Sequence, residues 1–389
     1  MKVLYLVSGI GPPAGWGTEF IQNLIFELSK KRIKATIINP IYHHTHSDWK
    51  QWAKEQNKKY GVRIISFEVP KFIQKRFLLH LLATPFFTTF YIFKLLIKEK
   101  FDLIHEFSST PIILFRAKLL RFFFRTPTVF TLSVYNNTLL GNFCWFKIFN
   151  FAKYYLIPSR EIIKKLISMG ISKNKIIFSP PGIPLNNFIN KIDKITARKN
   201  LHLPTNKFIF SYFGSLTTEK GVNEILKASQ LIPSHLHNKI LICLFAIWKG
   251  STEHRDIKRA IKELNLHYLD FREKYIHIPT LLAASNAVIF PQRTGLGVTI
   301  PPISIIESLA ADKKVILSDI PINAEFKKSK QCLFMPAGDS KQLAKIMEAI
   351  LINRSTSKPD KNLWRLNRFN LVKSIGLHLS VYKQIVEQE

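Results

Sequence analysis

Cysteine is scarce in this chain, with only Cys144, Cys243 and Cys332 among 389 residues. The three show neither paired nor metal-ligand spacing, which favours a reduced cytosolic compartment over secretion. The amino terminus has a single lysine and a short apolar run before a glycine. A signal peptide needs a longer apolar region and a small-residue cleavage site, so we expect a first buried strand there.

Acidic residues are also few, 26 against 57 lysines and arginines, which gives a net charge of +31. Such a charge favours anionic partners: nucleic acid, acidic lipid headgroups or phosphorylated substrates. The basic residues are spread along the chain without a dense basic tail, a clustered basic helix or a recognisable nucleic-acid module, so we expect no nucleic-acid partner. The alternative is compositional drift, since Lys, Ile, Asn and Phe are abundant together.

Apolar residues make up 47% of the chain, enough for large cores, and its length predicts two domains. Predicted strands alternate with helices in both halves, and no low-complexity segment interrupts them. We predict a first domain over residues 1–188, a polar and basic linker with a short helix over 189–206, a second domain over 207–362 and a helical tail over 363–389.

The first half begins with a strand, a glycine-rich loop and a helix. Lys2 to Val7 is typical of a buried parallel strand, and GIGPPAGWG (9–17) follows it before helical spacing begins. Glycines there let the backbone approach a ligand at a helix amino terminus, although a loop that merely turns would look the same. The next predicted strand ends at Asn39 instead of an acidic residue, so this is not a dinucleotide fingerprint.

The segment from Phe77 to Phe93 is very apolar. At 17 residues with a central Pro85, it is at the lower limit for a membrane span. Because it lies between two predicted strands of one sheet, we interpret it as an amphipathic crossover helix at a bilayer interface, where its flanking lysines meet acidic headgroups. A core helix in an apolar-biased protein is the alternative.

The second half contains two loops of the kind that bind ligands. A strand over 208–213 leads into Gly214 and SLTTEKG, so Lys220 stands near a helix amino terminus, where a lysine commonly neutralises phosphate. A strand over 287–290 precedes a glycine loop and a helix with Glu307, which is placed to accept hydrogen bonds from ribose hydroxyls. Taken singly, the lysine is typical of a solvated surface and the carboxylate of a helix start favoured by the dipole. Their occurrence in two loops of one domain favours the functional interpretation.

Several of these stretches resemble one family. FGSLTTEKGVNEILKA resembles the motif with which glycosyltransferases of the GT-B fold begin their donor domain. LLAASNAVIFP followed by PPISIIESLAADKKVILSD resembles their donor motif. In the family this motif is usually written as two glutamates separated by seven residues. GIGPPAGWGTEF looks like their acceptor-side loop, and YYLIPSREIIKKLISMGISKNKIIFSPPGIPLNNF like the end of their first domain. The chain is most similar to the retaining glycosyltransferases of family 4.

This resemblance implies the fold class α/β, GT-B: two Rossmann-like, doubly wound domains that face each other across a cleft, with the tail helix crossing back to the first domain. It implies transfer of a sugar from UDP, GDP or a similar nucleotide, with retention and with no obligatory metal or other cofactor. Lys220 would lie against the donor diphosphate, Glu307 would hold the ribose, and backbone N–H groups at a helix start would meet the phosphates. The donor-binding positions that it implies are Gly214, Ser215, Lys220, Ile303, Ser304 and Glu307, and the acceptor-side loop contains Gly15, Trp16 and Gly17.

Three positions depart from the family pattern. Thr299 stands eight residues before Glu307, where the first glutamate belongs, and Ser215 replaces the usual arginine or similar residue. Ser133 stands where a histidine often follows the fifth strand. Thr299 can hydrogen-bond a sugar hydroxyl but carries no charge, and loss of one stabilising group typically costs roughly 2.7–4 kcal/mol in the transition state.

Two neighbouring residues, His105 and Glu106, are predicted to end the fourth strand at the cleft edge, where they could partly substitute for the missing groups. The alternative for His105 is a histidine at a strand end without a catalytic duty. The candidate catalytic positions are therefore Lys220, Thr299, His105 and Ser133.

The sequence thus predicts a cytoplasmic glycosyltransferase, peripheral to the inner face of the membrane, with a nucleotide-sugar donor. Its acceptor would be lipid-linked or a polysaccharide precursor, and an anionic membrane surface would be a partner. The alternative within the fold is a weak or silent homologue that only binds nucleotide or glycan, and a basic nucleic-acid-binding protein is the alternative from another class.

Overall fold

The computed structural model describes residues 1–7, 10, 19–41, 49–68, 77–108, 114–132, 134–135, 144–148, 150–189, 192–246, 252–273, 276–295, 298–353 and 366–388. The chain divides into two compact units. Unit 1 consists of Met1–Ile183, Gly297–Pro301 and Phe369–Glu389, and unit 2 of Pro184–Leu296 and Pro302–Arg368. Each contains one large parallel sheet with helices between its strands, so the predicted α/β class with two domains is confirmed.

Unit 1 contains a seven-stranded parallel sheet in the order β3-β2-β1-β4-β5-β7-β8. Its strands are β1 (Lys2–Leu6), β2 (Lys34–Ile41), β3 (Arg63–Glu68), β4 (Leu103–Ser108), β5 (Thr128–Leu132), β7 (Tyr154–Ile157) and β8 (Ile176–Phe178). Its helices are α1 (Glu19–Ser29), α2 (Trp49–Tyr60), α4 (Phe77–Lys98), α5 (Phe115–Phe124), α6 (Cys144–Ile148), α7 (Arg160–Ser168) and α15 (Leu371–Gln388). The apolar runs that predicted strands are buried because helices cover both faces of the sheet.

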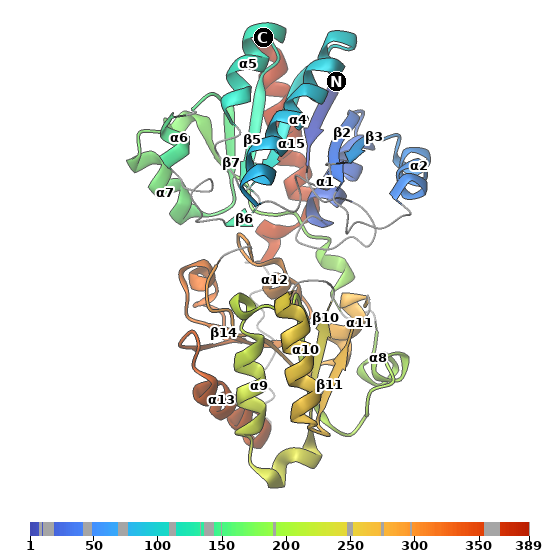
Figure 1. Ribbon diagram of the computed structural model, residues 1–389, viewed down its shortest axis with the longest axis vertical. Coiled ribbons are helices and arrows are strands. Elements are labelled where there is room, and N and C mark those ends of the chain that lie inside the picture. The colour runs from blue at the N-terminus through green and yellow to red at the C-terminus, as the bar shows by residue number, and fades with distance from the viewer. Residues whose placement is uncertain are drawn as a thin grey trace. The chain divides into compact units, whose positions relative to one another are not determined.

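The two faces of this sheet carry different side chains because neighbours along a strand point to opposite sides. Leu4 and Ile104 pack into a cluster with residues of α4 and α5, two helices that contact each other (Figure 1). Tyr5 and His105, the next residue of each strand, lie near Tyr382 of α15. Helix α15 also packs on α1, so the last described helix belongs to unit 1.

Unit 2 contains a six-stranded parallel sheet in the order β11-β10-β9-β12-β14-β15. Its strands are β9 (Phe208–Gly214), β10 (Ile240–Ala246), β11 (Leu269–Arg272), β12 (Ala287–Phe290), β14 (Lys314–Ser318) and β15 (Cys332–Met335). Its helices are α8 (Lys194–Asn200), α9 (Val222–Gln230), α10 (Thr252–Leu264), α11 (Ile278–Ala284), α12 (Ile303–Ala310) and α13 (Ser340–Asn353).

The segment predicted as a linker, 189–206, is instead built into unit 2. Helix α8 packs on α11. Arg198 of α8 donates hydrogen bonds to the carbonyls of Thr205 (2.7 Å) and Ala284 (3.0 Å). The short helix expected here is present, but a buried arginine anchors it in unit 2, so the segment is not a linker between the units.

The long apolar segment forms α4, which continues through Pro85 to Lys98. Among the residues that the structure describes, no helix is both long and apolar enough to cross a membrane. A short antiparallel pair, β6 (Val134–Tyr135) with β13 (Val298–Thr299), was not predicted, and it explains why residues 297–301 belong to unit 1.

Candidate functional site

The order of strands in unit 2 places one pair of loops side by side. The chain leaves β9 through α9 towards β10 on one side, and it enters β12 on the other side of β9. Open parallel sheets bind ligands at such a reversal of strand order, beyond the carboxyl ends of the strands. Strand β9 ends at Gly214 and β12 at Phe290, so the loops that follow them form the candidate site.

Local hydrogen bonds shape the loop after β9. The Tyr212 hydroxyl donates to the Ser215 carbonyl (2.6 Å), which turns the chain directly after Gly214. The side chain of Thr217 then caps a single 3₁₀ turn by accepting from the Lys220 backbone N–H (3.3 Å). A capped turn holds the backbone of Lys220 in one position relative to the start of α9.

Gly221 lets this loop approach the end of β12. Its φ is +76°, in the left-handed region that favours glycine. A Cβ atom added there would lie 1.7 Å from the Pro291 carbonyl oxygen. The glycine next to Lys220 is therefore required for the two loops to meet.

Polar contacts join the same two loops. The Arg293 backbone N–H donates to the Glu219 carbonyl (2.9 Å), and the Thr294 hydroxyl donates to the Glu219 carboxylate. The Arg293 guanidinium donates from Nε (2.9 Å) and from a terminal nitrogen (2.5 Å) to Glu224, whose side chain is 1% exposed. This hydrogen-bonded ion pair raises the pKa of Arg293. No local sequence pattern predicts this pair, because its members are 69 residues apart.

Lys220 is partly desolvated at this edge. Burial lowers the pKa of its ammonium to about 8, although the neighbouring Glu219 acts in the opposite direction. Loss of hydration disfavours the charged form unless an anion is close. The attraction between a phosphate and the Lys220 ammonium would therefore be stronger than at a fully hydrated lysine.

Helix α12 begins at the same edge because it follows β12 in a parallel sheet. Ile303 and Ser304 occupy its first two positions, and Glu307 lies on its second turn, partly buried. The first N–H groups of a helix lack partners within it and attract anions. Unit 2 thus places the first-loop residues Gly214, Ser215 and Lys220 and the α12 residues at one edge, in neighbouring connections.

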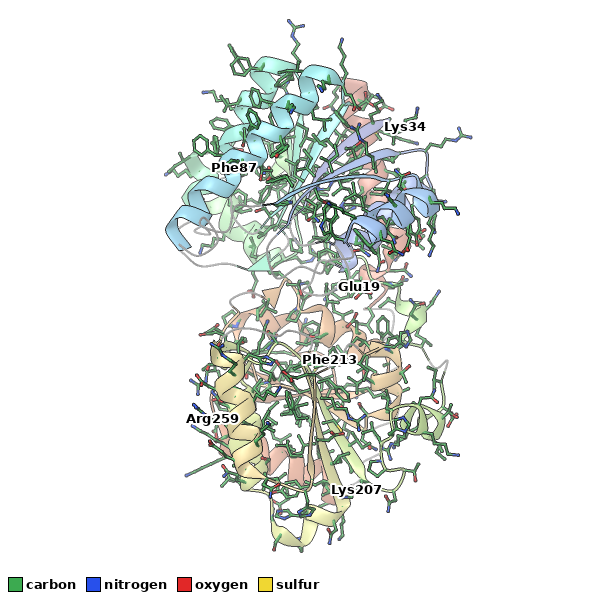
Figure 2. All side chains as sticks on the ribbon, turned by 45° about the vertical axis from the view of Figure 1, so that its right-hand side comes forward. Glu19, Lys34, Phe87, Lys207, Phe213 and Arg259 are labelled. Carbon is green, nitrogen blue, oxygen red and sulfur yellow. The ribbon has the colours of Figure 1, made fainter. Side chains whose placement is uncertain are left out.

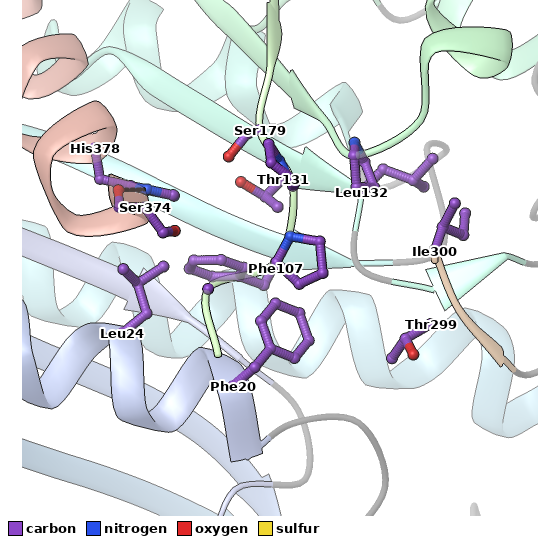
Figure 3. Close-up of a pocket in the computed structure, with 14 residues that line it drawn as sticks. Phe20, Leu24, Phe107, Thr131, Leu132, Ser179, Thr299, Ile300, Ser374 and His378 are labelled. Atoms are coloured by element: carbon purple, nitrogen blue, oxygen red, sulfur yellow. Dashed lines mark hydrogen bonds between the residues drawn. The ribbon is translucent and has the colours of Figure 1, made fainter. Parts of the chain in front are cut away.

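Thr299 belongs to unit 1, where it is 9% exposed. It pairs with Val134 in the ladder between β13 and β6. It also lines a small cavity of unit 1, together with Phe107, Thr131, Ser179, Ser374 and His378 (Figure 3). The cavity has about 10 Å³ of space, close to the lower limit for one water molecule or one hydroxyl group.

The tail helix contributes two polar atoms near this cavity. Ser374 Oγ and His378 Nε2 are buried and have no hydrogen-bond partner in the part of the chain that the structure describes. His378 Nδ1 donates to the Ser374 carbonyl (2.7 Å) in its neutral form, and burial lowers the pKa of this histidine to about 4. Nε2 is then a buried acceptor.

The prediction that His105 and Glu106 end the fourth strand and partly replace the missing charged groups is wrong. Strand β4 continues to Ser108, so neither residue ends it, and His105 is fully buried. Its ring nitrogens hydrogen-bond with the hydroxyls of Tyr382 (2.5 Å) and Thr131 (2.7 Å). Burial, with a smaller effect of His378, holds the pKa of His105 well below its usual range, so it stays neutral.

Glu106 is equally unavailable, because it forms a buried ion pair with Arg116. The remaining predicted positions, Ser133 and the acceptor-side loop with Gly15, Trp16 and Gly17, lie outside the described residues.

Comparisons with known proteins agree with this architecture. Residues 17–187 match the family described as Glycosyltransferase Family 4, and residues 193–363 match the family described as Glycosyl transferases group 1. No curated protein matches the chain.

Solved structures match over almost the full chain. HepE from Anabaena, in complex with UDP, has a TM-score of 0.74 at 17% identity and covers 99% of this chain and 100% of its own. A glycosyltransferase from Rickettsia africae gives 0.74 at 17%, covering 100% of this chain and 99% of its own. Sucrose-phosphate synthase from Thermosynechococcus elongatus gives 0.76 at 17%, with 100% of both chains covered. At this level of identity the likeness establishes a common fold.

Proposed function

From the premise that the chain is a glycosyltransferase of the GT-B class, with halves that match family 4 and group 1, we propose its reaction. It transfers a sugar from a nucleoside-diphosphate sugar, with retention, to a lipid-linked or polysaccharide-precursor acceptor. The observation that carries the proposal is the strand-order reversal of unit 2. There, Lys220 and the amino end of α12 lie in adjacent loops, and Gly221 lets those loops touch.

The donor would bind at this edge through three kinds of group. The Lys220 ammonium meets the diphosphate as a point charge, and the backbone N–H groups of Ile303 and Ser304 add the helix amino terminus. Glu307 accepts hydrogen bonds from the ribose hydroxyls. Charge that develops on the leaving diphosphate would be met by the same groups, which need no rearrangement during the reaction. The HepE structures with UDP and with UDP-glucose support a uridine nucleotide as the first donor to try.

Donor binding is tested by the melting temperature of the full chain with UDP, GDP and their sugars. We expect one nucleotide to raise it, and we expect Lys220→Ala and Glu307→Ala to remove most of that rise. Lys227→Ala is the matched control, because Lys227 is an exposed lysine of the same unit. The proposal fails if no nucleotide diphosphate changes the melting temperature, or if the control behaves like the site variants.

A second candidate function is nucleotide binding without turnover. Thr299 favours it, because this uncharged residue stands where the family has a glutamate and is fixed in the β13–β6 ladder. Release of free sugar from a panel of nucleotide sugars separates the two candidates. Measurable release by the wild type, lost in Lys220→Ala, supports the transferase, whereas binding without release supports the second function.

The lipid side of the proposal is supported by an aromatic surface on unit 1. We use this name for Phe86, Phe87 and Phe90 of α4 with Leu119, Phe122 and Phe123 of α5. Phe86 is 71% exposed and Phe122 is 79% exposed, and Figure 2 shows Phe87 on the same helix. Exposed lysines and arginines stand on the same two helices or directly after α5: Lys94, Lys98, Lys118, Arg121 and Arg125.

Aromatic side chains beside cations are the composition that binds an interface with anionic lipid headgroups. We therefore propose that the enzyme works on the cytoplasmic face of a membrane, bound through the aromatic surface. Sedimentation with phosphatidylcholine vesicles, with and without phosphatidylglycerol, tests this. Binding should require the anionic lipid, weaken with salt, and fall at least tenfold in Phe122→Ser/Phe123→Ser.

The control for this experiment is Ile352→Ser/Val372→Ser, which removes two apolar side chains that are exposed elsewhere. Membrane binding that is insensitive to salt, or equal in the two double variants, would overturn the proposed surface without affecting the donor site.

A further inference from the structure

Unit 2 has a cavity at the end of its sheet opposite to the donor loops. It measures about 580 Å³ and is lined where the strands begin: Phe208 starts β9, Lys314 starts β14, and Lys239 and Asn286 directly precede β10 and β12. Figure 2 shows Lys207 near one end of unit 2 and Phe213, at the far end of β9, near the other. Strand β9 has seven residues, so about 20 Å of strand lies between this cavity and the donor loops.

Positive charge dominates the lining of this basic cavity. Five of its residues are cations and one, Asp312, is an anion. The cations are Lys194, Arg198, Lys207, Lys239 and Lys314. None of the five forms an ion pair within the described part of the chain, and one oxygen of Asp312 accepts from the Gln331 amide (2.6 Å). The cavity therefore concentrates positive charge that its single carboxylate offsets only in part.

Arg198 is the fixed centre of this charge. Its side chain is 2% exposed, yet all its hydrogen bonds in the described structure go to neutral groups: the carbonyls of Thr205, Lys207 (3.0 Å) and Ala284, and the amide oxygen of Asn286 (2.6 Å). The buried guanidinium of unit 1, Arg116, is by contrast paired with a glutamate. A buried cation without a counter-charge is costly, and an anion in the adjacent cavity would reduce that cost.

The positive charge of Arg198 also acts on two neighbouring lysines, Lys194 and Lys313. Burial, and then the charge of Arg198, lower the pKa of Lys194. Burial lowers the pKa of Lys313, which directly precedes Lys314, to about 8; Lys194 and Arg198 contribute in the same direction, and Asp312 acts in the opposite direction. Cations so close together favour a ligand with more than one negative charge.

We propose that the basic cavity binds a small phosphorylated ligand with two or more negative charges. Its volume is that of a small-molecule site, which commonly has about 300–1,000 Å³. Guanidinium and ammonium groups are the usual partners of phosphate oxygens. The side chains of Thr205, Asn206 and Asn238 also line the cavity and can hydrogen-bond hydroxyl or ester oxygens of the rest of the ligand. This site is separate from the diphosphate site of the donor and does not depend on it.

The test is calorimetric titration of the full chain with inorganic pyrophosphate at fixed ionic strength. A nucleotide diphosphate that binds the donor loops is held at saturation throughout, so that pyrophosphate cannot use them. We expect binding in the wild type and at least tenfold weaker binding in Lys207→Gln/Lys314→Gln. The control, Lys227→Gln/Lys262→Gln, removes two exposed lysines of the same unit and should keep wild-type affinity.

Nucleotide affinity of each variant shows whether unit 2 is still folded. Pyrophosphate binding that disappears when the nucleotide is saturating overturns the proposal, and so does equal weakening in the two double variants. If no nucleotide binds, the titration is done with Lys220→Ala in place of saturation, so failure of the donor site does not decide the result.

Two further ligands identify the source of the phosphate. Hexose bisphosphate is a free phosphorylated ligand, and phosphatidic acid in phosphatidylcholine vesicles is a lipid headgroup. Binding of either that is weakened by Lys207→Gln/Lys314→Gln but not by the control supports the basic cavity. The aromatic-surface variant, Phe122→Ser/Phe123→Ser, should leave binding of pyrophosphate and hexose bisphosphate unchanged, and the phosphatidic acid titrations are made in its background so that the aromatic surface does not contribute.

Discussion

Replacing Gly221 by alanine tests whether the two donor loops must touch. The added Cβ has two separate costs. A left-handed backbone costs an alanine about 1–2 kcal/mol. The contact at 1.7 Å with the Pro291 carbonyl forces the end of β12 or the loop to move, and such overpacking typically costs about 1–3 kcal/mol. Together we expect Gly221→Ala to destabilise unit 2 by about 2–5 kcal/mol.

Gly338 provides the matched control within the same unit. Its φ is +82°, but an added Cβ would meet nothing within 4 Å, so only the backbone term of about 1–2 kcal/mol applies. For a unit of this size 1 kcal/mol changes the melting temperature by about 2–4 °C. Gly338→Ala should therefore lower it by about 2–8 °C and Gly221→Ala by about 4–20 °C.

The assay is thermal unfolding followed by circular dichroism, with nucleotide affinity measured on the folded variants. Gly221→Ala should also weaken nucleotide binding, because the loop that moves carries Lys220, whereas Gly338→Ala should not. Equal melting temperatures for the two variants, with equal nucleotide affinity, would refute the argument that contact with Pro291 fixes the site.

Three further predictions follow from the charged groups. Because burial lowers the pKa of Lys220 to about 8, nucleotide affinity measured by calorimetry should fall as the pH rises from 7 to 9.5. Lys220→Arg, whose side chain stays charged throughout this range, should flatten the profile, and a flat wild-type profile would contradict the prediction. Arg293→Ala leaves Glu224 as a buried carboxylate without its cation, so it should destabilise unit 2 by about 2–3 kcal/mol in urea unfolding, below the usual 3–5 because Arg293 is partly exposed; adding Glu224→Gln should restore part of the loss. The folded-state pKa of His378, about 4, lies below the ordinary value of about 6.5. Its contribution to stability is therefore present above pH 6.5 and is lost as the pH falls towards 4, which amounts to about 3 kcal/mol at 1.36 kcal/mol per pH unit. The variant His378→Leu should lose less stability than the wild type over that range.

The sequence predicted much of the fold because the relevant signals are local. The apolar runs at Lys2, Phe208 and Ala287 became strands, since a parallel sheet covered by helices buries both faces of each strand. Glycines after each of these runs indicated loops for a ligand. At 189–206 the expected short helix is present as α8, but the segment is not a linker, because a buried arginine anchors that helix within unit 2.

The candidate site was only partly predictable, because local patterns identify motifs but not the contacts between distant residues. Lys220 and Glu307 were identified from their motifs, but the contacts that hold their loops together were not. Arg293 and Glu224 form their pair across 69 residues, and the hydrogen bond between His105 and Tyr382 spans 277. No periodicity connects positions so far apart. The structure therefore changed His105 from a candidate catalyst to a buried residue that the tail helix holds in place.

The sequence by itself determined which segments are strands and helices, where the glycine loops fall, and that the chain carries a large excess of positive charge. These properties follow from the preferences of neighbouring residues. Only the tertiary structure decided which charges act together. It placed the loop of Lys220 against the loop that follows β12, gathered the cations of the basic cavity at the opposite end of the same sheet, and put Thr299 into unit 1. The reason is that strand order, which no local pattern encodes, determines which loops share an edge.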